Sequence, residues 1–431
     1  MVGKILDINL IVVISLILLF SYLKLFNQKH NIKTYSLLHP TFLFVISFVI
    51  SYVVIKHRWS MFYVPFCALS MLSIILFNEL NISLLLTLAL ALSVAAVANG
   101  DFYIGLFFLV NGILSVILTQ GVRKRIAIIR AGFIIGIIQT IILILGRGVF
   151  AKEFIGKFLF SVYILPFING IGSSIVVVGV LPIFEYLFRK VTNISLLELA
   201  DFNHPLLQRL VLEAPGTYHH SLVVGNLSEA ACNAIGAHAL LARIGAYYHD
   251  IGKLSKPEYF SENQTLEENK HDSLSPSMSK MIIMNHVRDG VDLAKKYRLN
   301  TGLIDFITQH HGTSLVYYFY LRALENLEED QRIKEEGFRY PGPKPNTRET
   351  AVVLLADSVE AAVRALKDPT PARISEVVHK VINNKFIDGQ LDECDLTLKD
   401  LEKISEVFTR ILSGIYHSRV AYPENYKQAL R

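Results

Sequence analysis

Long apolar segments in the first 190 residues constrain the fold of this chain more than any other feature. Of its 431 residues, 52% are hydrophobic and 18% are charged, and most of the charged residues follow residue 190. A membrane-spanning helix needs about 20 mostly apolar residues. Seven segments approach that length, near 8–26, 40–55, 61–78, 82–98, 102–119, 126–146 and 157–187. We therefore expect a seven-helix transmembrane bundle over residues 1–190, followed by a separate domain over residues 191–431.

The first and last of these segments are unusual. The first, Ile8 to Phe26, is longer than a signal-peptide core, and Asn27 to His30 follow it in place of a small-residue cleavage site. It is therefore predicted to be a retained membrane helix. The last contains Pro166 and several small or polar residues, which predicts either one kinked, tilted helix or two short ones.

Basic residues in the connectors predict the orientation in the membrane. With seven helices, one side receives Lys24, Lys29, Lys33, Arg123, Lys124, Arg125, Arg189 and Lys190, and the other receives Lys56 and Arg58. Positive charge concentrates on the cytoplasmic side of membrane proteins. We therefore expect a multi-pass protein of the cell membrane with its N-terminus outside and residues 191–431 in the cytoplasm. Lys56 and Arg58 are discordant with this orientation.

The overall charge and the cysteines point to no further class of partner. The formal net charge is +5, and much of it lies in the connectors, so it favours a lipid bilayer and not nucleic acid as partner. The three cysteines, Cys67, Cys232 and Cys394, are far apart, which predicts buried free thiols and no cysteine-based metal site. A homo-oligomer is left open by the sequence.

Residues 191–431 are expected to be all-α, because apolar residues recur there every three or four positions. Ser275-Pro276 is a helix start signal, and Asn346 with Glu349 predicts a capping box. Residues 337–345 hold three prolines and two glycines and are predicted to be a loop. The expected helices are 217–235, 239–253, 275–297, 302–311 and 346–366.

Histidine and aspartate residues in this half suggest a metal site. His220 and His286 lie on the apolar faces of their helices, and Asp357 lies inside an apolar helix, where an unpaired carboxylate would be costly. Each residue alone is explained as well by a hydrogen-bonded core position. Together, imidazole and carboxylate ligands suit two divalent ions such as iron, manganese, zinc or cobalt. The seven candidate ligands are His220, His249, Asp250, His286, His310, His311 and Asp357.

Two such ions clamp a phosphodiester and activate the water that cleaves it. Asp250 is predicted to be catalytic as the carboxylate that bridges the two ions. Lys253, one turn later, is expected to be free to contact a phosphate or the nucleophile, and its alternative is a solvated lysine at a helix end. Arg364, two turns after Asp357, is the second predicted substrate-binding residue.

Several motifs resemble those of the HD superfamily of metal-dependent phosphohydrolases. They begin at Glu213 (EAPGTYHHS), Tyr247 (YYHDIGK), Asn285 (NHVRDG), Gln309 (QHHGT), Tyr340 (YPGPKP) and Leu355 (LADSVEA). The set is similar to the seven-transmembrane HD-domain family, whose members include cyclic di-AMP phosphodiesterases of the PgpH type. Members of that family commonly carry a large extracellular domain between a first membrane helix and the bundle, whereas this chain starts almost at the bundle. It is therefore either a short natural variant or a piece of a longer protein, and ligand sensing from outside is left open.

The resemblance implies a division of the ligands. His220, His249, Asp250 and Asp357 would hold one ion, and Asp250, His286, His310 and His311 would hold the other. It also implies iron or manganese as the metal, and hydrolysis of cyclic di-AMP to linear pApA.

Two alternatives remain open. The same fold can act on another nucleotide, such as cyclic di-GMP or a guanosine alarmone. The chain can also be a membrane receptor whose HD domain binds a nucleotide without cleaving it, although seven intact ligands argue against this.

Overall fold

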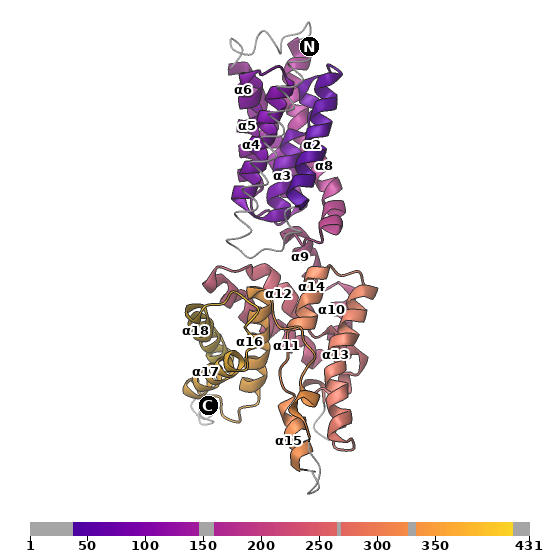
Figure 1. Ribbon diagram of the computed structural model, residues 1–431, viewed down its shortest axis with the longest axis vertical. Coiled ribbons are helices and arrows are strands. Elements are labelled where there is room, and N and C mark those ends of the chain that lie inside the picture. The colour runs from indigo at the N-terminus through magenta and orange to yellow at the C-terminus, as the bar shows by residue number, and fades with distance from the viewer. Residues whose placement is uncertain (1–37, 146–158, 265–268, 326–332, 417–431) are drawn as a thin grey trace, which may run out of the picture. The chain divides into compact units, whose positions relative to one another are not determined.

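The computed structural model describes residues 38–145, 159–264, 269–325 and 333–416. The chain divides into two compact units, residues 1–197 and 198–431 (Figure 1). The described residues form helices and loops, with one isolated bridge between Leu315 and Arg339 and no strand. The all-α prediction is confirmed.

The described part of the first unit is a bundle of apolar helices. They are α2 (Leu38–Lys56), the 3-10 turn η2 (Met61–Tyr63), α3 (Phe66–Phe77), α4 (Leu80–Val97), α5 (Phe102–Thr119), α6 (Arg125–Leu145) and α8 (Leu159–Phe188). Five of these helices are long and apolar enough to cross a membrane. The segment 8–26, expected to be the first span, lies outside the described residues. The protein is a multi-pass membrane protein.

The expected span 61–78 is not one long helix, and this corrects the prediction. Pro65 separates η2 from the 12-residue helix α3. At about 1.5 Å per residue, α3 is too short to cross a bilayer core of about 30 Å. Eleven of its residues, Phe66 to Leu76, are buried, so α3 is a central helix of the bundle.

Polar side chains compensate for this break in the helix. The Asn169 Nδ2 atom on α8 donates hydrogen bonds to the carbonyl oxygens of Phe62 and Val64, at 2.5 and 3.1 Å. Irregular backbone inside a membrane needs such internal partners. The segment that holds Asn169 is one continuous helix, with Pro166 and Pro182 inside it, and not two short ones.

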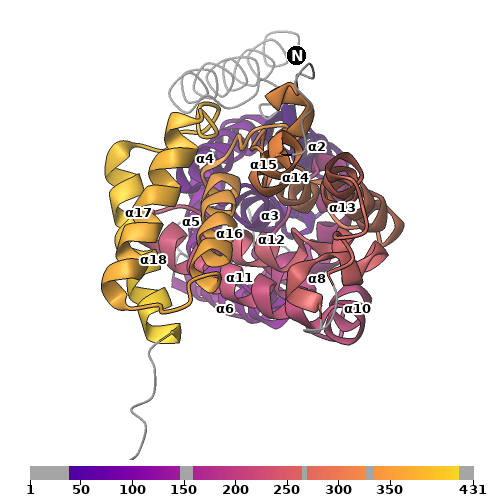
Figure 2. The same cartoon turned by 90° about the horizontal axis from the view of Figure 1, so that it is seen from below.

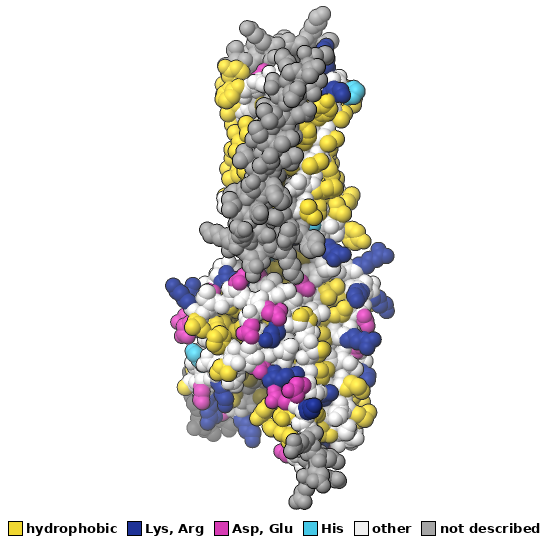
Figure 3. Space-filling model, in the orientation of Figure 1, with side chains coloured by type: hydrophobic (Ala, Val, Ile, Leu, Met, Phe, Trp, Pro, Cys, Tyr) yellow, Lys and Arg dark blue, Asp and Glu magenta, His cyan; other side chains and the backbone are white. Residues whose placement is uncertain are grey.

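The surfaces of the two units differ in composition. Apolar side chains are the main coloured type on the described surface of the bundle, whereas Lys, Arg, Asp and Glu are spread over the second unit (Figure 3). Exposed residues on the bundle include Val49, Leu92, Ile117, Phe133 and Ile175. An apolar outer surface is what lipid tails require.

The second unit is a helical domain. Its helices are α10 (Pro205–Glu213), α11 (Pro215–Ile235), α12 (Ala239–Tyr248), α13 (Pro276–Lys296), α14 (Thr301–Gln309), α15 (Tyr317–Glu325), α16 (Arg348–Arg364), α17 (Pro371–Ile387) and α18 (Leu398–Ile415). Short 3-10 turns are η3 (Ile251–Ser255), η4 (Pro257–Tyr259), η5 (Ser261–Asn263) and η6 (Glu335–Phe338). α11 packs against α12, α16 and α18, and α17 and α18 lie side by side next to α16 (Figure 2).

Two details of the predicted helices were wrong. The expected helix 239–253 ends at Tyr248, and a 3-10 turn begins at Ile251. The cap of α16 is Thr347 with Thr350, and not Asn346 with Glu349. The Glu349 carboxylate accepts a hydrogen bond from the His238 backbone N–H, at 2.7 Å, so a contact between helices takes the place of the predicted local one.

The break after Tyr248 has a physical cause. A Cβ atom on Gly252 would meet the His286 carbonyl oxygen at 1.8 Å. Only glycine permits this approach, and it allows the backbone of η3 to pack directly against the backbone of α13. The chain therefore leaves the axis of α12 at His249 and Asp250, directly beside His286.

Candidate metal centre

The seven predicted ligands come from five places in the second unit. His220 lies on α11, His286 on α13 and Asp357 on α16, whereas two dipeptides follow the ends of α12 and α14. The dipeptides are His249-Asp250 and His310-His311. The structure brings all seven together in two groups whose donor atoms lie within 4.8 Å of one another. One group is His220, His249, Asp250 and Asp357, and the other is Asp250, His286, His310 and His311.

Asp250 belongs to both groups because its two oxygens face different ways. Oδ2 lies 3.2 Å from Nε2 of His249 and 3.7 Å from Nε2 of His220. Oδ1 lies 3.3 Å from Nε2 of His286 and 3.5 Å from Nε2 of His310. One carboxylate therefore faces two sets of imidazole nitrogens, which is the geometry of a bridging ligand.

Hydrogen bonds from Nδ1 to backbone carbonyls fix the orientation of three of the histidine rings. Nδ1 of His249 donates to the Ala246 carbonyl and Nδ1 of His286 to the Ile283 carbonyl, at 2.6 and 2.5 Å. Nδ1 of His310 donates to the Ile307 carbonyl at 2.9 Å. The remaining ring nitrogen, Nε2, points into the cluster in each case. Metal-binding histidines are oriented in this way.

Glu360 plays the same part for His220. Its Oε2 lies 2.5 Å from Nδ1 of His220, and Nε2 of the same ring is 3.0 Å from Oδ1 of Asp357. Glu360 is 2% exposed. It was not predicted, although it lies three residues after Asp357 on the same face of α16, where it could have been noticed.

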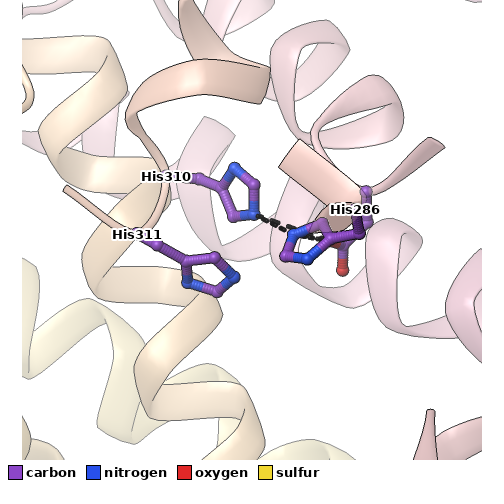
Figure 4. A group of neighbouring side chains, drawn as sticks. His286, His310 and His311 are labelled. Atoms are coloured by element: carbon purple, nitrogen blue, oxygen red, sulfur yellow. Dashed lines mark hydrogen bonds and ion pairs between the residues drawn. The ribbon is translucent and has the colours of Figure 1, made fainter. Parts of the chain in front are cut away.

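His311 and Asp357 form the open edge of the cluster. Their side chains are 22% and 11% exposed, whereas the other five are at most 2% exposed. Nδ1 of His311 lies 3.6 Å from Oδ2 of Asp357. The His311 ring stacks on Tyr340, with the ring centroids 4.3 Å apart. Figure 4 shows how His311 lies beside the facing rings of His286 and His310.

The charges of the cluster are set by burial and by the carboxylates. Burial opposes ionisation of Asp250, but His249 and Lys253 outweigh it and hold its pKa well below the ordinary value. Burial would lower the pKa of His249, but Asp250 outweighs it and raises that pKa to about 10. Burial lowers the pKa of His286 to about 4, so that ring is neutral.

The donor set fits divalent metal ions. Nε2 of His249 and Oδ1 of Asp250 are buried and have no hydrogen-bond partner among the described residues. Buried polar atoms normally have a partner. A cation between the two sets of nitrogens would satisfy both atoms, and neutral imidazoles with carboxylates are ligands for ions such as iron, manganese or zinc.

Lys253 is not free, which corrects the prediction. Its Nζ lies 2.8 Å from Oδ2 of Asp250 and 2.6 Å from Oε1 of Glu262. Glu262 also accepts a hydrogen bond from Thr217 Oγ1 at the start of α11, at 3.1 Å. Nothing in the sequence indicated Glu262, because it lies in the three-residue turn η5 and reaches the site only through folding.

Arg364 is also paired. Its guanidinium lies 3.3 Å from Oε1 of Glu360, whose other oxygen contacts His220. Arg364 therefore reaches the cluster through Glu360 and is not among the residues that surround the donor atoms. A small, partly open hollow adjoins the cluster at His286 and is lined also by Gly252, Lys256, Phe260, Ile282, Asn285 and Asp289.

Comparison with known proteins agrees with this division of the chain. The family described as "7TM receptor with intracellular HD hydrolase" matches residues 3–192, and the HD domain family matches residues 217–362. The chain belongs to the seven-transmembrane HD family. The described members of the metal cluster all lie within the matched HD domain.

Relatives in this family include two proteins named cyclic-di-AMP phosphodiesterase PgpH. The protein of Bacillus subtilis is 39% identical over 93% of this chain and 58% of its own length. The protein of Listeria monocytogenes is 42% identical over 75% of this chain and 44% of its own length. This chain thus spans less than two thirds of either relative. A crystal structure of the L. monocytogenes PgpH HD domain is 47% identical to this chain, with a TM-score of 0.48. The match covers 50% of this chain and 100% of the crystallised domain.

Proposed function

We propose that this chain is a membrane-bound, metal-dependent phosphodiesterase that hydrolyses cyclic di-AMP to linear pApA. The observation that carries the proposal is the position of Asp250, whose two oxygens face two sets of imidazole nitrogens. Two divalent ions held there would polarise a phosphate and lower the pKa of water. The preference for cyclic di-AMP rests on the names of the two relatives.

In this proposal His220, His249, Asp250 and Asp357 hold one ion, and Asp250, His286, His310 and His311 hold the other. Iron or manganese is the proposed metal, because imidazole and carboxylate ligands suit both. His311 and Asp357 lie at the exposed edge, so the scissile phosphate would approach from that side.

Lys253 is proposed to stabilise negative charge on the scissile phosphate. Its ammonium group is held beside Asp250 by Glu262, so its charge lies next to the place where the reacting phosphate would bind. A fixed cation near developing charge stabilises a transition state. Arg364 is proposed to help hold the substrate. It does so less directly than Lys253, because its guanidinium is paired with Glu360.

The substrate is tested with the purified full-length chain. We expect turnover of cyclic di-AMP after iron or manganese is added to metal-free protein, with pApA as product. Cyclic di-GMP, a guanosine alarmone and cyclic di-AMP are compared at equal concentration. Faster turnover of one of the other nucleotides would reassign the substrate, and binding without turnover of any of them would identify a receptor.

We propose that the domain after residue 190 lies in the cytoplasm, where cyclic dinucleotides are made and used. The support is the excess of basic residues in the connectors assigned to that side. A reporter active only in the cytoplasm, fused after Arg431, is expected to be active. An active periplasmic reporter at the same position would overturn both the orientation and the substrate class.

A further inference from the structure

A cyclic dinucleotide has two phosphates, and the metal centre can neutralise only the one that is cleaved. This inference rests on the proposed function and concerns the second phosphate. The cations near the exposed edge of the cluster are mostly paired with carboxylates already. Arg339 contacts Glu335 and Asp388, and Lys344 contacts Asp392.

Lys385, in the last turn of α17, is the exception. Its Nζ donates a hydrogen bond to Ser314 Oγ at 2.7 Å, and within the described ranges no carboxylate lies within ion-pair distance of it. Burial lowers the pKa of this lysine, and Asp357 is the first of the acidic groups that oppose the decrease. A partly buried ammonium group without a counter-ion is unfavourable, and an anion that binds beside it would offset that cost.

The position of Ser314 places this ammonium group next to the open edge of the cluster. The Ser314 backbone N–H donates to the His311 carbonyl at 3.0 Å, so the two residues belong to one turn. His311 is the most exposed of the seven candidate ligands. A phosphate that reaches the cluster past His311 would therefore pass close to Lys385.

A network of hydrogen bonds holds Lys385 in this position before any substrate arrives. The Gln390 amide oxygen accepts from the Thr313 backbone N–H at 2.8 Å, and the Gln390 amide nitrogen donates to Thr313 Oγ1 at 3.0 Å. Gly312 has a φ of +54°, and a Cβ there would meet the Gln390 amide oxygen at 2.4 Å. The end of α17 is thus fastened to the turn after His311.

We propose that Lys385 binds the phosphodiester of the substrate that is not being cleaved. The alternative is that Lys385 only fastens Ser314 and supports the fold. A binding role predicts a change in KM that depends on substrate charge and on salt, whereas a structural role predicts a change in stability or metal content.

The test uses the full-length chain in detergent or nanodiscs, loaded with metal. The variants are Lys385→Met, which keeps length and removes charge, and Lys385→Arg, which keeps charge. Lys380→Met is the matched control, because Lys380 is exposed on the same helix. Two substrates are compared: cyclic di-AMP, with two phosphates, and bis(p-nitrophenyl) phosphate, with one.

We expect Lys385→Met to raise KM for cyclic di-AMP about tenfold or more, as the loss of a charge-assisted hydrogen bond would. Metal content and kcat should change little, KM for the single-phosphate substrate should shift far less, and the dependence of KM on salt should weaken. Lys385→Arg should retain most of the affinity, and Lys380→Met should resemble the unmodified protein.

Equal shifts of KM for both substrates, or an unchanged KM for cyclic di-AMP, would overturn the proposal. So would a rise in KM for Lys256→Ala without one for Lys385→Met, since Lys256 lines the hollow beside His286. If the unmodified chain cleaves the single-phosphate substrate but no cyclic di-AMP, the proposed function fails. Lys385 is then tested by using pApA as an inhibitor of the single-phosphate reaction. The inhibition constant of pApA should be higher for Lys385→Met than for the unmodified chain, and an unchanged constant would refute the proposal.

Discussion

Nε2 of His286 lies 3.1 Å from Nε2 of His310, although Nδ1 of each ring is hydrogen bonded to a backbone carbonyl. With both Nδ1 atoms acting as donors, neither Nε2 has a proton to give in the neutral ring. The lone pairs of the two Nε2 atoms would then face and repel each other. A cation bound between them would be attracted to both lone pairs and would remove that repulsion.

Asp250→Ala is expected to abolish hydrolysis and to remove both metals. The Asp250 carboxylate faces both sets of imidazole nitrogens, so without it both metal sites would lose a ligand and a negative charge that offsets the charge of the ion. The loss should be on the order of a thousandfold or more in rate. Turnover and metal analysis by mass spectrometry measure the result, with Asp368→Ala as an exposed control. Near-normal turnover with two metals per chain would contradict the dinuclear centre.

His286→Ala is expected to lose one metal and keep about one. Nε2 of His286 lies beside Oδ1 of Asp250 and Nε2 of His310, whereas His220, His249 and Asp357 surround the other oxygen. Metal analysis should give about half the content of the unmodified chain, with a large loss of turnover. Retention of both metals together with normal turnover would count against the division of ligands.

Glu360→Ala is expected to weaken metal binding without removing a ligand. Glu360 holds Nδ1 of His220, and loss of such an orienting partner typically costs about 10- to 100-fold in metal affinity. A competition titration with a chelator measures the change. Glu402→Ala, on the exposed face of α18, is the control. Unchanged affinity in Glu360→Ala would show that the cluster orients His220 without it.

Lys253→Ala is expected to lower kcat while both metals stay bound. Its charge acts on the reacting phosphate in the proposed mechanism, and Lys253 is not itself one of the seven candidate ligands. Because Glu262 holds Lys253 in place, Glu262→Gln should lower kcat in the same direction but less. Loss of the metals in Lys253→Ala, or normal turnover of cyclic di-AMP, would show that the lysine has only a structural role.

Metal binding is expected to release protons at neutral pH and to tighten as pH rises. Burial alone would lower the pKa of His249, but Asp250 raises it to about 10, so the metal-free ring is protonated at neutral pH. A ring that binds metal has to lose that proton. Calorimetric titrations in buffers with different heats of ionisation measure the release. Affinity that is independent of pH between about 6 and 8 would contradict it.

The same pKa shifts determine how the metal-free fold responds to pH. The raised pKa of His249 stabilises the fold fully below the ordinary value of 6.5, and this contribution is lost as pH rises towards about 10. The lowered pKa of His286, about 4, destabilises the fold as pH falls below 6.5, because the unfolded chain binds the proton first. Thermal unfolding of metal-free protein across this range should follow both trends.

The sequence alone determined the parts of this protein that depend on local pattern. Apolar segments of membrane length lead to apolar helices, because a bilayer admits little else, and the three- to four-residue repeat leads to an all-α second unit. The candidate ligands were also readable, since histidine and aspartate on apolar helix faces are costly without a partner. The cysteines were predicted to be buried free thiols; all three are free, Cys67 and Cys232 are buried, and Cys394 is half-buried.

Tertiary structure alone decided which groups surround those ligands. Glu262 meets Lys253, and Lys385 meets Ser314, across segments that no local pattern connects. The backbone break before the short central helix α3 is tolerated because Asn169, on a distant part of the chain, donates hydrogen bonds to the carbonyl oxygens of Phe62 and Val64. Periodicity reports which way a residue faces along its own helix, whereas contacts between distant segments depend on how whole helices pack.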